Sequence, residues 1–262
     1  MPTAEILNIG TELVLGETVN TNATFLARHL SRAGFQVRRI TVVGDIPQEI
    51  QAAAREALAR SQVLVVTGGL GPTVDDPTRA ALAQAVGRPL EFRDDAWEEI
   101  VARVRARGRE PTENARRMAY LPRGAQALPN SVGVAPGFVV ETEDRRVLVA
   151  LPGVPREMEA MFLGHGLPYL RRRFGLQTET LRTRVLVVEG VPEAWIDEKL
   201  GDLEKRENPF LGLSCSPGRV HLRLRARGQT PQEAETLLDQ LEAEIRQRLP
   251  WPVRREDETE KV

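Results

Sequence analysis

The chain has 262 residues, with 36 basic and 37 acidic side chains, three histidines and one cysteine. A lone cysteine cannot form an internal disulfide, and the scattered histidines do not have zinc-site spacing, so a bound metal would need oxygen ligands. The formal charge of −1 argues against a protein whose main role is to neutralise nucleic-acid phosphates. With no apolar run of transmembrane length and no signal segment at the start, we expect a cytoplasmic protein without a membrane partner.

Short apolar runs alternate with longer amphipathic ones from Ala4 to Leu151, which is typical of βαβ units around a parallel sheet. The runs with strand character are Glu5–Ile9, Gln36–Val43, Gln62–Val66, Phe138–Glu141 and Arg146–Leu151. Helices are expected from Thr21, from Asp45-Pro47, from Asp75-Asp76-Pro77, over Asp94–Arg107, over Thr112–Ala119 and from Pro155 toward Phe174. The order predicts an α/β domain over residues 1–174 with a mostly parallel sheet.

A second pattern follows residue 175. It contains a strand at Thr183–Val188, a helix at Glu193–Glu204, strands at Leu211–Ser214 and Arg219–Ala226, and a helix at Pro231–Leu249. This β-α-β-β-α order predicts a small α+β domain over residues 175–252. Residues 253–262 are charged and unpatterned, so we expect a tail there.

A glycine-rich loop stands between a buried strand and a helix start. It consists of Gly68, Gly69, Leu70, Gly71, Pro72 and Thr73, and it is followed by Asp75, Asp76 and Thr78. Glycines let the backbone approach a ligand, and a helix N-terminus favours a phosphate. The alternative is a tight turn in which an aspartate only caps the helix. Two adjacent carboxylates exceed what capping needs, and a carboxylate beside phosphates requires a divalent cation.

Other strand ends carry polar residues as well. Gly10 and Glu12 follow the first strand, Asp45 follows the second, and Gly153 and Pro155 follow the last. Singly these are turn residues, and Asp45 alone is better explained as a helix cap. Together they favour a metal-assisted phosphoryl or nucleotidyl site. The chain has neither a Gly-x-Ser-x-Gly elbow nor a Walker A lysine.

These motifs resemble the amino-terminal part of the CinA family of competence/damage-inducible proteins, over roughly residues 4 to 250. The matching segments are Gly10-Thr11-Glu12, Asn20-Thr21-Asn22, Val43-Gly44-Asp45, Gly68 to Thr78, Asn114 and Leu151-Pro152-Gly153-x-Pro155. The resemblance implies a three-layer α/β fold of the MoaB/Mog-like molybdopterin-binding type, followed by a small KH-like α+β domain.

The resemblance also implies an activity: a metal-dependent pyrophosphatase that hydrolyses ADP-ribose, or a related nucleoside diphosphate sugar or dinucleotide, to AMP and ribose 5-phosphate. The metal would be Mg²⁺, Mn²⁺ or Co²⁺, and a homodimer is the expected assembly. We expect Asp45, Asp75 and Asp76 to be catalytic, and Asp75, Asp76 and Glu12 to hold the metal. The remaining substrate-binding candidates are Gly10, Asn20, Asn22, Gly68 to Thr73, Thr78, Asn114, Gly153 and Pro155, with solvated capping as the alternative for the asparagines.

Two other functions are compatible with these residues. A Mog-type adenylyltransferase would use the same loop to transfer AMP from ATP to molybdopterin, and a non-catalytic module would bind the nucleotide without turnover. The chain stops where the nicotinamide mononucleotide deamidase domain of many CinA proteins begins, so we expect that activity only from a separate chain. The second domain lacks the Gly-x-x-Gly loop of KH domains, so nucleic-acid binding is not expected.

Overall fold

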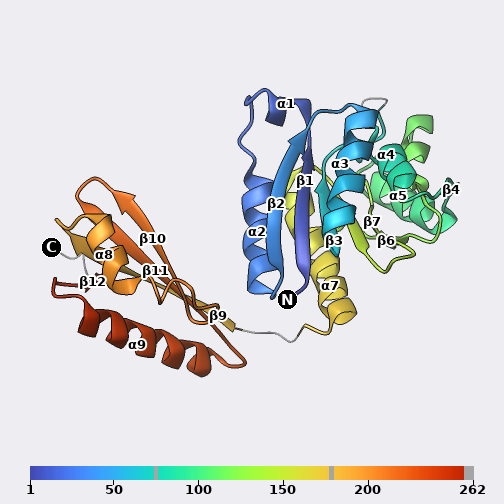
Figure 1. Cartoon of the computed structure of the whole chain (residues 1–262). Coiled ribbons are helices and arrows are strands. Elements are labelled where there is room, and N and C mark those ends of the chain that lie inside the picture. Colours follow the sequence, from blue (N-terminus) through green and yellow to red (C-terminus); the bar gives the residue numbers. More distant parts are fainter. Residues whose placement is uncertain (74–75, 177–179, 257–262) are drawn as a thin grey trace. The chain divides into compact units, whose positions relative to one another are not determined.

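The computed structural model describes residues 1–73, 76–176 and 180–256. It divides into two compact units, Met1–Leu176 and Gln177–Val262, each with its own core (Figure 1). The division falls two residues later than the predicted end of the first domain at residue 174. No helix of the described residues has the length and apolarity needed to cross a membrane.

Unit 1 is built on a six-stranded sheet with the order β2-β1-β3-β8-β7-β6. Its strands are β1 (Thr3–Ile9), β2 (Gln36–Val43), β3 (Val63–Thr67), β6 (Gln126–Leu128), β7 (Gly137–Glu141) and β8 (Val147–Leu151). Strands β2, β1, β3 and β8 are mutually parallel, whereas β7 runs antiparallel to both of its neighbours. Strands β4 (Leu90–Phe92) and β5 (Tyr120–Pro122) form a separate antiparallel pair.

Helices cover both faces of this sheet (Figure 1). One face carries α3 (Pro47–Arg60), α4 (Thr78–Ala85), α5 (Asp94–Ala106) and the 3₁₀ helix η1 (Glu113–Ala119). The other carries α2 (Thr21–Arg32) and a continuous helical run of α6 (Pro155–Met161), the π turn η2 (Phe162–Gly166) and α7 (Leu167–Phe174). The three-layer, mostly parallel α/β prediction is confirmed.

Alternation along the buried strand β3 separates two hydrophobic cores. Leu64 and Val66 pack with the α3 to η1 layer, whereas Val63 and Val65 pack with the α2 and α6 to α7 layer. Successive side chains of a strand point to opposite faces, so a continuous apolar run is what a central strand covered on both faces requires. The run is flanked by parallel neighbours, β1 and β8.

The carboxyl ends of β1, β3 and β8 meet at one edge of the sheet. Asn8 pairs with Thr67, and Thr67 pairs with Leu151, so the three strands end almost level. Parallel strands in register release their following loops at the same edge. The segments after Ile9, Thr67 and Leu151 therefore start side by side, near the top of unit 1 in Figure 1.

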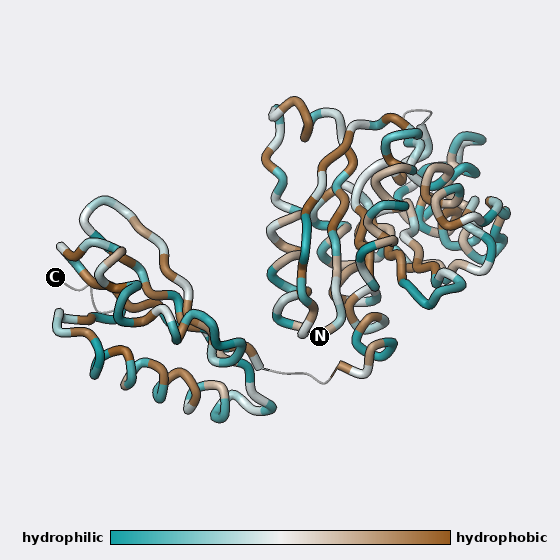
Figure 2. The backbone as a smooth tube through the Cα atoms, in the orientation of Figure 1, coloured by the Kyte–Doolittle hydropathy of each residue, from teal (hydrophilic) through white to brown (hydrophobic). Residues whose placement is uncertain are grey.

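Unit 2 has the expected β-α-β-β-α order, with one added strand. Its elements are β9 (Thr180–Glu189), α8 (Glu193–Leu200), β10 (Phe210–Ser216), β11 (Arg219–Gly228), α9 (Pro231–Arg248) and β12 (Arg254–Arg255). The antiparallel sheet has the order β10-β11-β9-β12. Figure 2 shows hydrophobic residues recurring along α9 between hydrophilic ones, and the apolar positions pack on the sheet.

Several sequence predictions need correction. Residues 253–262 were expected to be a tail, but Val253 packs into the unit 2 core and Arg254–Arg255 pair with β9 as β12. The charge pattern was misleading there because Arg255 is bound by a buried carboxylate, that of Glu242. The third helix begins at Thr78 rather than at the aspartates. The short elements α1 (Thr11–Val14), β4, β5 and β6 were not predicted, because three or four residues carry too little periodicity.

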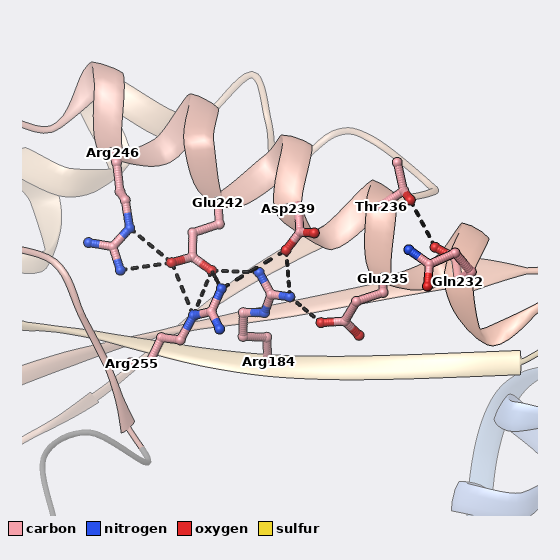
Figure 3. Close-up of polar contacts among 8 residues, drawn as sticks. All are labelled: Arg184, Gln232, Glu235, Thr236, Asp239, Glu242, Arg246 and Arg255. Atoms are coloured by element: carbon pink, nitrogen blue, oxygen red, sulfur yellow. Dashed lines mark hydrogen bonds and ion pairs between the residues drawn. The ribbon is translucent and has the colours of Figure 1, made fainter.

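An ion network centred on the buried Glu242 carboxylate holds α9 on the unit 2 sheet (Figure 3). Glu242 of α9 accepts hydrogen bonds from Arg184 of β9 at 2.6 Å and from Arg255 of β12 at 3.0 Å. Arg246, one turn further along α9, donates to the same carboxylate at 2.9 Å. Arg184 also pairs with Asp239 and Glu235. Burial raises the pKa of Glu242, but the hydrogen bonds from these three arginines outweigh it and hold that pKa at about 2.

We predict that Glu242→Ala lowers the free energy of unfolding of unit 2 by about 3 kcal/mol, because it removes the buried carboxylate that pairs with Arg184, whose side chain is only 9% exposed. Glu235→Ala is the matched control: that carboxylate also binds Arg184 but its side chain is 46% exposed, so we expect a cost below about 1 kcal/mol. Urea unfolding of Trp97→Phe variants measures this, since Trp195 and Trp251 then report on unit 2 alone.

The same variants test the pH dependence. Because the folded pKa of Glu242 lies below the ordinary carboxyl value of 4.5, its stabilisation is present above that pH and is lost as the pH falls toward 2. Wild type is therefore expected to lose more stability than Glu242→Ala between pH 5 and pH 3. Equal losses in the two proteins would contradict the network's role.

Candidate functional site

Three backbone segments come together at Gly68, the first residue after β3. Its N–H donates to the Leu151 carbonyl at 3.1 Å, and a Cβ at this position would lie 2.1 Å from the Ile9 carbonyl oxygen. A Cβ on Gly153 would lie 3.3 Å from the Cα of Gly68. With φ at +106°, Gly68 also has a backbone conformation that side chains rarely adopt. The loops after β1, β3 and β8 can approach this closely only because position 68 is glycine.

A cavity of about 670 Å³ lies beside this junction. One wall is the glycine loop, with Gly69, Leu70, Gly71 and Pro72, together with Asp76 and the Pro152 to Val154 segment. A second, largely apolar part of the lining is formed by Val104, Pro111, Ala115, Met118, Val134 and Ala135. The lining also includes the polar residues Arg107, Arg109, Glu110, Thr112 and Glu157. A cavity with one apolar wall and a few convergent polar groups is the usual form of a small-molecule site.

Asp76 closes the glycine loop rather than capping the helix. Its Oδ2 accepts hydrogen bonds from the Thr73 N–H at 3.0 Å and from Thr73 Oγ1 at 2.6 Å. A Cβ at position 71 would lie 2.4 Å from Oδ2, so the Asp76 carboxylate packs directly on Gly71. The capping position of α4 is occupied by Pro77. Asp76 therefore brings a carboxylate to the cavity wall, while Asp75 lies outside the described residues.

Two further side chains lie beneath the loop. Thr78 is fully buried against Gly69, and its Oγ1 has no hydrogen-bond partner among the described residues. Arg79 is also buried and donates to the carbonyls of Leu70 and, at 3.1 Å, Gly71. Burial lowers the pKa of Arg79 to about 10, and Asp76 opposes this shift. The guanidinium is therefore still charged at neutral pH.

A smaller pocket of about 100 Å³ collects other predicted residues. It is lined by Ile9, Glu12, Leu13, Thr18 to Asn22, Thr67, Gly153 and Pro155. The Asn22 amide donates to the Gly153 carbonyl at 2.8 Å, and Asn20 caps α2 by accepting from the Ala23 N–H at 3.0 Å. Gly153 lines this pocket and the large cavity alike. The predicted residues thus occur in two neighbouring hollows that share one glycine.

The remaining predicted residues line neither hollow. Asp45 accepts from the N–H and Oγ1 of Thr11, at 2.9 and 2.8 Å, and so joins the ends of β1 and β2. Gly10 lies in the same turn and packs against the Glu12 carboxylate. Asn114 is exposed in η1, between the cavity residues Thr112 and Ala115. The other three contact the loop or its ends without lining the cavity: Gly68 bonds to Leu151, Thr73 bonds to Asp76, and Thr78 packs on Gly69.

The carboxylates do not converge on one point within the described parts of the chain. No group of three or more aspartate, glutamate, histidine or cysteine side chains there is arranged to hold a metal ion. Asp76 faces the large cavity and Glu12 the small pocket. A magnesium-type ion usually takes one or two protein carboxylates and completes its shell with substrate phosphates and water. The Asp76 carboxylate at the loop fits that requirement.

Sequence reasoning missed Glu157 and Asn130. Glu157, in the first turn of α6, lines the cavity and accepts from the Asn130 amide at 2.7 Å. Asn130 is 1% exposed and its Oδ1 binds the N–H groups of Val132 and Gly133. A loop with several turn-forming residues, Asn130 to Gly137, was the available signal, but nothing in the local pattern places it beside the glycine loop.

Comparison with known proteins identifies the family. A model described as "Probable molybdopterin binding domain" matches residues 5–172, and one described as "Damage-inducible protein CinA KH domain" matches residues 183–251. The chain belongs to the CinA family. The predicted pairing of a MoaB/Mog-like domain with a KH-like domain is thereby confirmed.

Individual relatives agree with this assignment. A CinA-like protein of Parasynechococcus marenigrum is 46% identical over 93% of this chain, which spans 58% of that relative's length. A protein of Pyrobaculum calidifontis is 42% identical, with 91% of this chain and 92% of the relative aligned. The crystal structure of a CinA protein of unknown function from Thermoplasma acidophilum is 37% identical and has a TM-score of 0.59, covering 63% of this chain and 96% of that one.

We predict that Gly69→Ala destabilises unit 1 more than Gly87→Ala. Both glycines have positive φ, +62° and +68°, so alanine carries a similar backbone cost of about 1 kcal/mol at each. At position 69 the new Cβ would also lie 2.1 Å from Thr78 Oγ1, whereas nothing lies within 4 Å at position 87. We expect an additional loss of about 1–3 kcal/mol for Gly69→Ala.

Urea unfolding followed by Trp97 fluorescence measures this difference. Replacing Trp195 and Trp251 by Phe leaves Trp97 as a reporter of unit 1. Similar free energies of unfolding for the two alanine variants would show that the loop does not pack tightly on Thr78.

Proposed function

We propose that this CinA-family protein hydrolyses the diphosphate bond of ADP-ribose, or of a related nucleoside diphosphate sugar or dinucleotide, and releases AMP and ribose 5-phosphate. The observation that supports it most is the glycine loop at the wall of a roughly nucleotide-sized cavity of about 670 Å³. In that loop the N–H groups of Gly69, Leu70 and Gly71 have no hydrogen-bond partner among the described residues. Such a run of free N–H groups suits phosphate oxygens.

The two walls of the cavity suit the two parts of a nucleotide. The diphosphate would lie along Gly69 to Thr73, within reach of the N-terminus of α4. The nucleoside would lie against the apolar wall that includes Val104, Met118 and Val134. Arg107 and Arg109 also line the cavity and add positive charge that favours an anionic ligand.

The small pocket would take the second half of the substrate. Gly153 borders both hollows, so a substrate that crosses this glycine could extend from one into the other. Asn20, Asn22 and Glu12 provide amide and carboxylate groups there, which suit the hydroxyls of a pentose. This division would account for the predicted site residues that line the two hollows.

A divalent cation, Mg²⁺, Mn²⁺ or Co²⁺, would be held by Asp76 with Asp75, and when bound it would offset phosphate charge and lower the pKa of a coordinated water. In the hydrolysis, a water oxygen bonds to one phosphorus while the bridging P–O bond breaks toward the leaving phosphate. Hydrogen bonds from the N–H and Oγ1 of Thr73 hold the Asp76 carboxylate at the loop. Glu12, on the other side of Gly153, remains the candidate for binding the attacking water, whereas Asp45 is occupied by Thr11.

The two other functions are distinguished by their products. A Mog-type adenylyltransferase would form an adenylylated product from ATP and molybdopterin, and a binding module would retain ADP-ribose unchanged. The apolar wall and the glycine loop are compatible with all three functions, because each binds an adenine nucleotide. The proposal therefore depends on the products observed.

We predict that the purified protein releases AMP from ADP-ribose in the presence of Mg²⁺, Mn²⁺ or Co²⁺, measured by chromatography of the nucleotides. The double substitution of Asp75 and Asp76 by Asn is expected to reduce this release at least about a hundredfold, because charge stabilisation at the phosphates is lost. Asp94→Asn is the control, since Asp94 is also an acidic residue in the first turn of a helix but is exposed and outside the cavity. Undiminished turnover in the double variant would refute the assignment of the aspartates.

We further predict that Asn22→Ala raises the KM for ADP-ribose several-fold while the protein stays folded. The variant removes the 2.8 Å hydrogen bond to the Gly153 carbonyl, which fixes the segment between the two hollows. Thr24→Ala, an exposed position on the same helix, should leave KM unchanged. Steady-state kinetics of both variants test this, and equal KM values would argue against a substrate that crosses Gly153.

A further inference from the structure

Arg79 is a buried cation that the proposed chemistry does not use. It follows Thr78 in the first turn of α4 and is 5% exposed. Among the described residues it makes no ion pair within 4.0 Å, and its Nε has no hydrogen-bond partner. Burying a charge without an opposite charge costs free energy, so a buried guanidinium at this position suggests a role beyond packing.

The hydrogen bonds of Arg79 fix the orientation of the loop. Its two terminal nitrogens donate to the carbonyls of Leu70 and Gly71, neighbouring residues of the cavity wall. In a trans peptide the N–H points opposite to the C=O. With the Leu70 carbonyl held on Arg79, the Gly71 N–H must point away from Arg79.

Arg79 itself does not line the cavity, whereas Leu70, Gly71 and Pro72 do. The guanidinium therefore lies on the protein side of the loop and the cavity on the other. From there its positive charge acts across one layer of backbone, where little water screens it. Both effects favour an anion on the cavity side.

We propose that Arg79 is a positioning residue for a diphosphate, resting on the proposed function. Arg79 orients the Leu70–Gly71 peptide so that the Gly71 N–H faces the phosphates. The negative charge of the phosphates in turn balances the positive charge of the buried guanidinium. Its effect is expected at the phosphate end of the ligand, because its hydrogen bonds reach only the carbonyls of Leu70 and Gly71 in the glycine loop. Arginine suits the task because its planar fork reaches two adjacent carbonyls at once.

The test is calorimetric binding of two probes, ADP and adenosine, to the full chain in the presence of Mg²⁺. Arg79→Gln is expected to weaken ADP binding at least tenfold and to leave adenosine binding within twofold of wild type. Arg79→Lys keeps the positive charge but lacks the planar guanidinium, so we expect a loss of ADP affinity between those of wild type and Arg79→Gln. The lysine variant is used alone if Arg79→Gln does not fold.

Arg88→Gln is the matched control. Arg88 also donates to two main-chain carbonyls of unit 1, those of Arg123 at 2.9 Å and Glu141 at 2.5 Å, but it lies outside the cavity lining. This variant should bind both probes as wild type does. Unchanged ADP binding by Arg79→Gln and Arg79→Lys, or equal losses for ADP and adenosine, would overturn the role of Arg79. Wild type that binds neither probe would overturn the proposed function as well.

Discussion

The close approach of three loops at Gly68 is the constraint on which the site depends. The strands β1, β3 and β8 end level, and their following segments meet where a Cβ would strike the Ile9 carbonyl at 2.1 Å. The hydrophobic cores on the two sheet faces hold these strands rigidly in place. The loops therefore start from one edge, where the N–H groups of Gly69, Leu70 and Gly71 have no hydrogen-bond partner among the described residues.

Much of unit 1 could be predicted because its signals are local and long. The continuous apolar run Val63–Thr67 and the amphipathic run from Pro155 are each long enough to identify an element, and Thr21 and Pro47 mark helix starts. Elements of three or four residues, such as β4 and α1, carry too little. Strand β12 was not predicted for another reason. Its charged residues suggest a solvent-exposed segment, whereas the carboxylate that binds Arg255 belongs to Glu242 in α9.

The site was predictable in its location but not in its internal arrangement. The strand-end rule brings Gly10, Gly68 and Gly153 to one edge, and the structure places their segments there. The strand-end rule could not show that Glu12 and Asp76 line different hollows, because that depends on the side of Gly153 on which each loop lies. Arg79 and Glu157 were missed because their partners are main-chain or distant groups with no sequence signature.

The two units use buried charge in different ways. In unit 2, Glu242 is surrounded by Arg184, Arg246 and Arg255, so the ions compensate one another and fasten a helix to a sheet. Around Arg79 no such carboxylate pairing occurs in the described residues, and the guanidinium holds backbone carbonyls instead. A closed network is what a structural role needs, whereas a cation beside an open cavity is suited to an anionic ligand.

The central claim is that an adenine nucleotide binds in the large cavity, with its phosphates on the glycine loop. The most direct measurement is a titration of ADP, in the presence of Mg²⁺, into protein labelled at the methionine methyl groups and observed by NMR. Met118 lines the cavity, whereas Met158 and Met161 are buried in the core on the other face of the sheet. The account predicts a saturable shift of the Met118 signal with little change at Met158 and Met161. An unmoved Met118 signal while ADP is bound would contradict it.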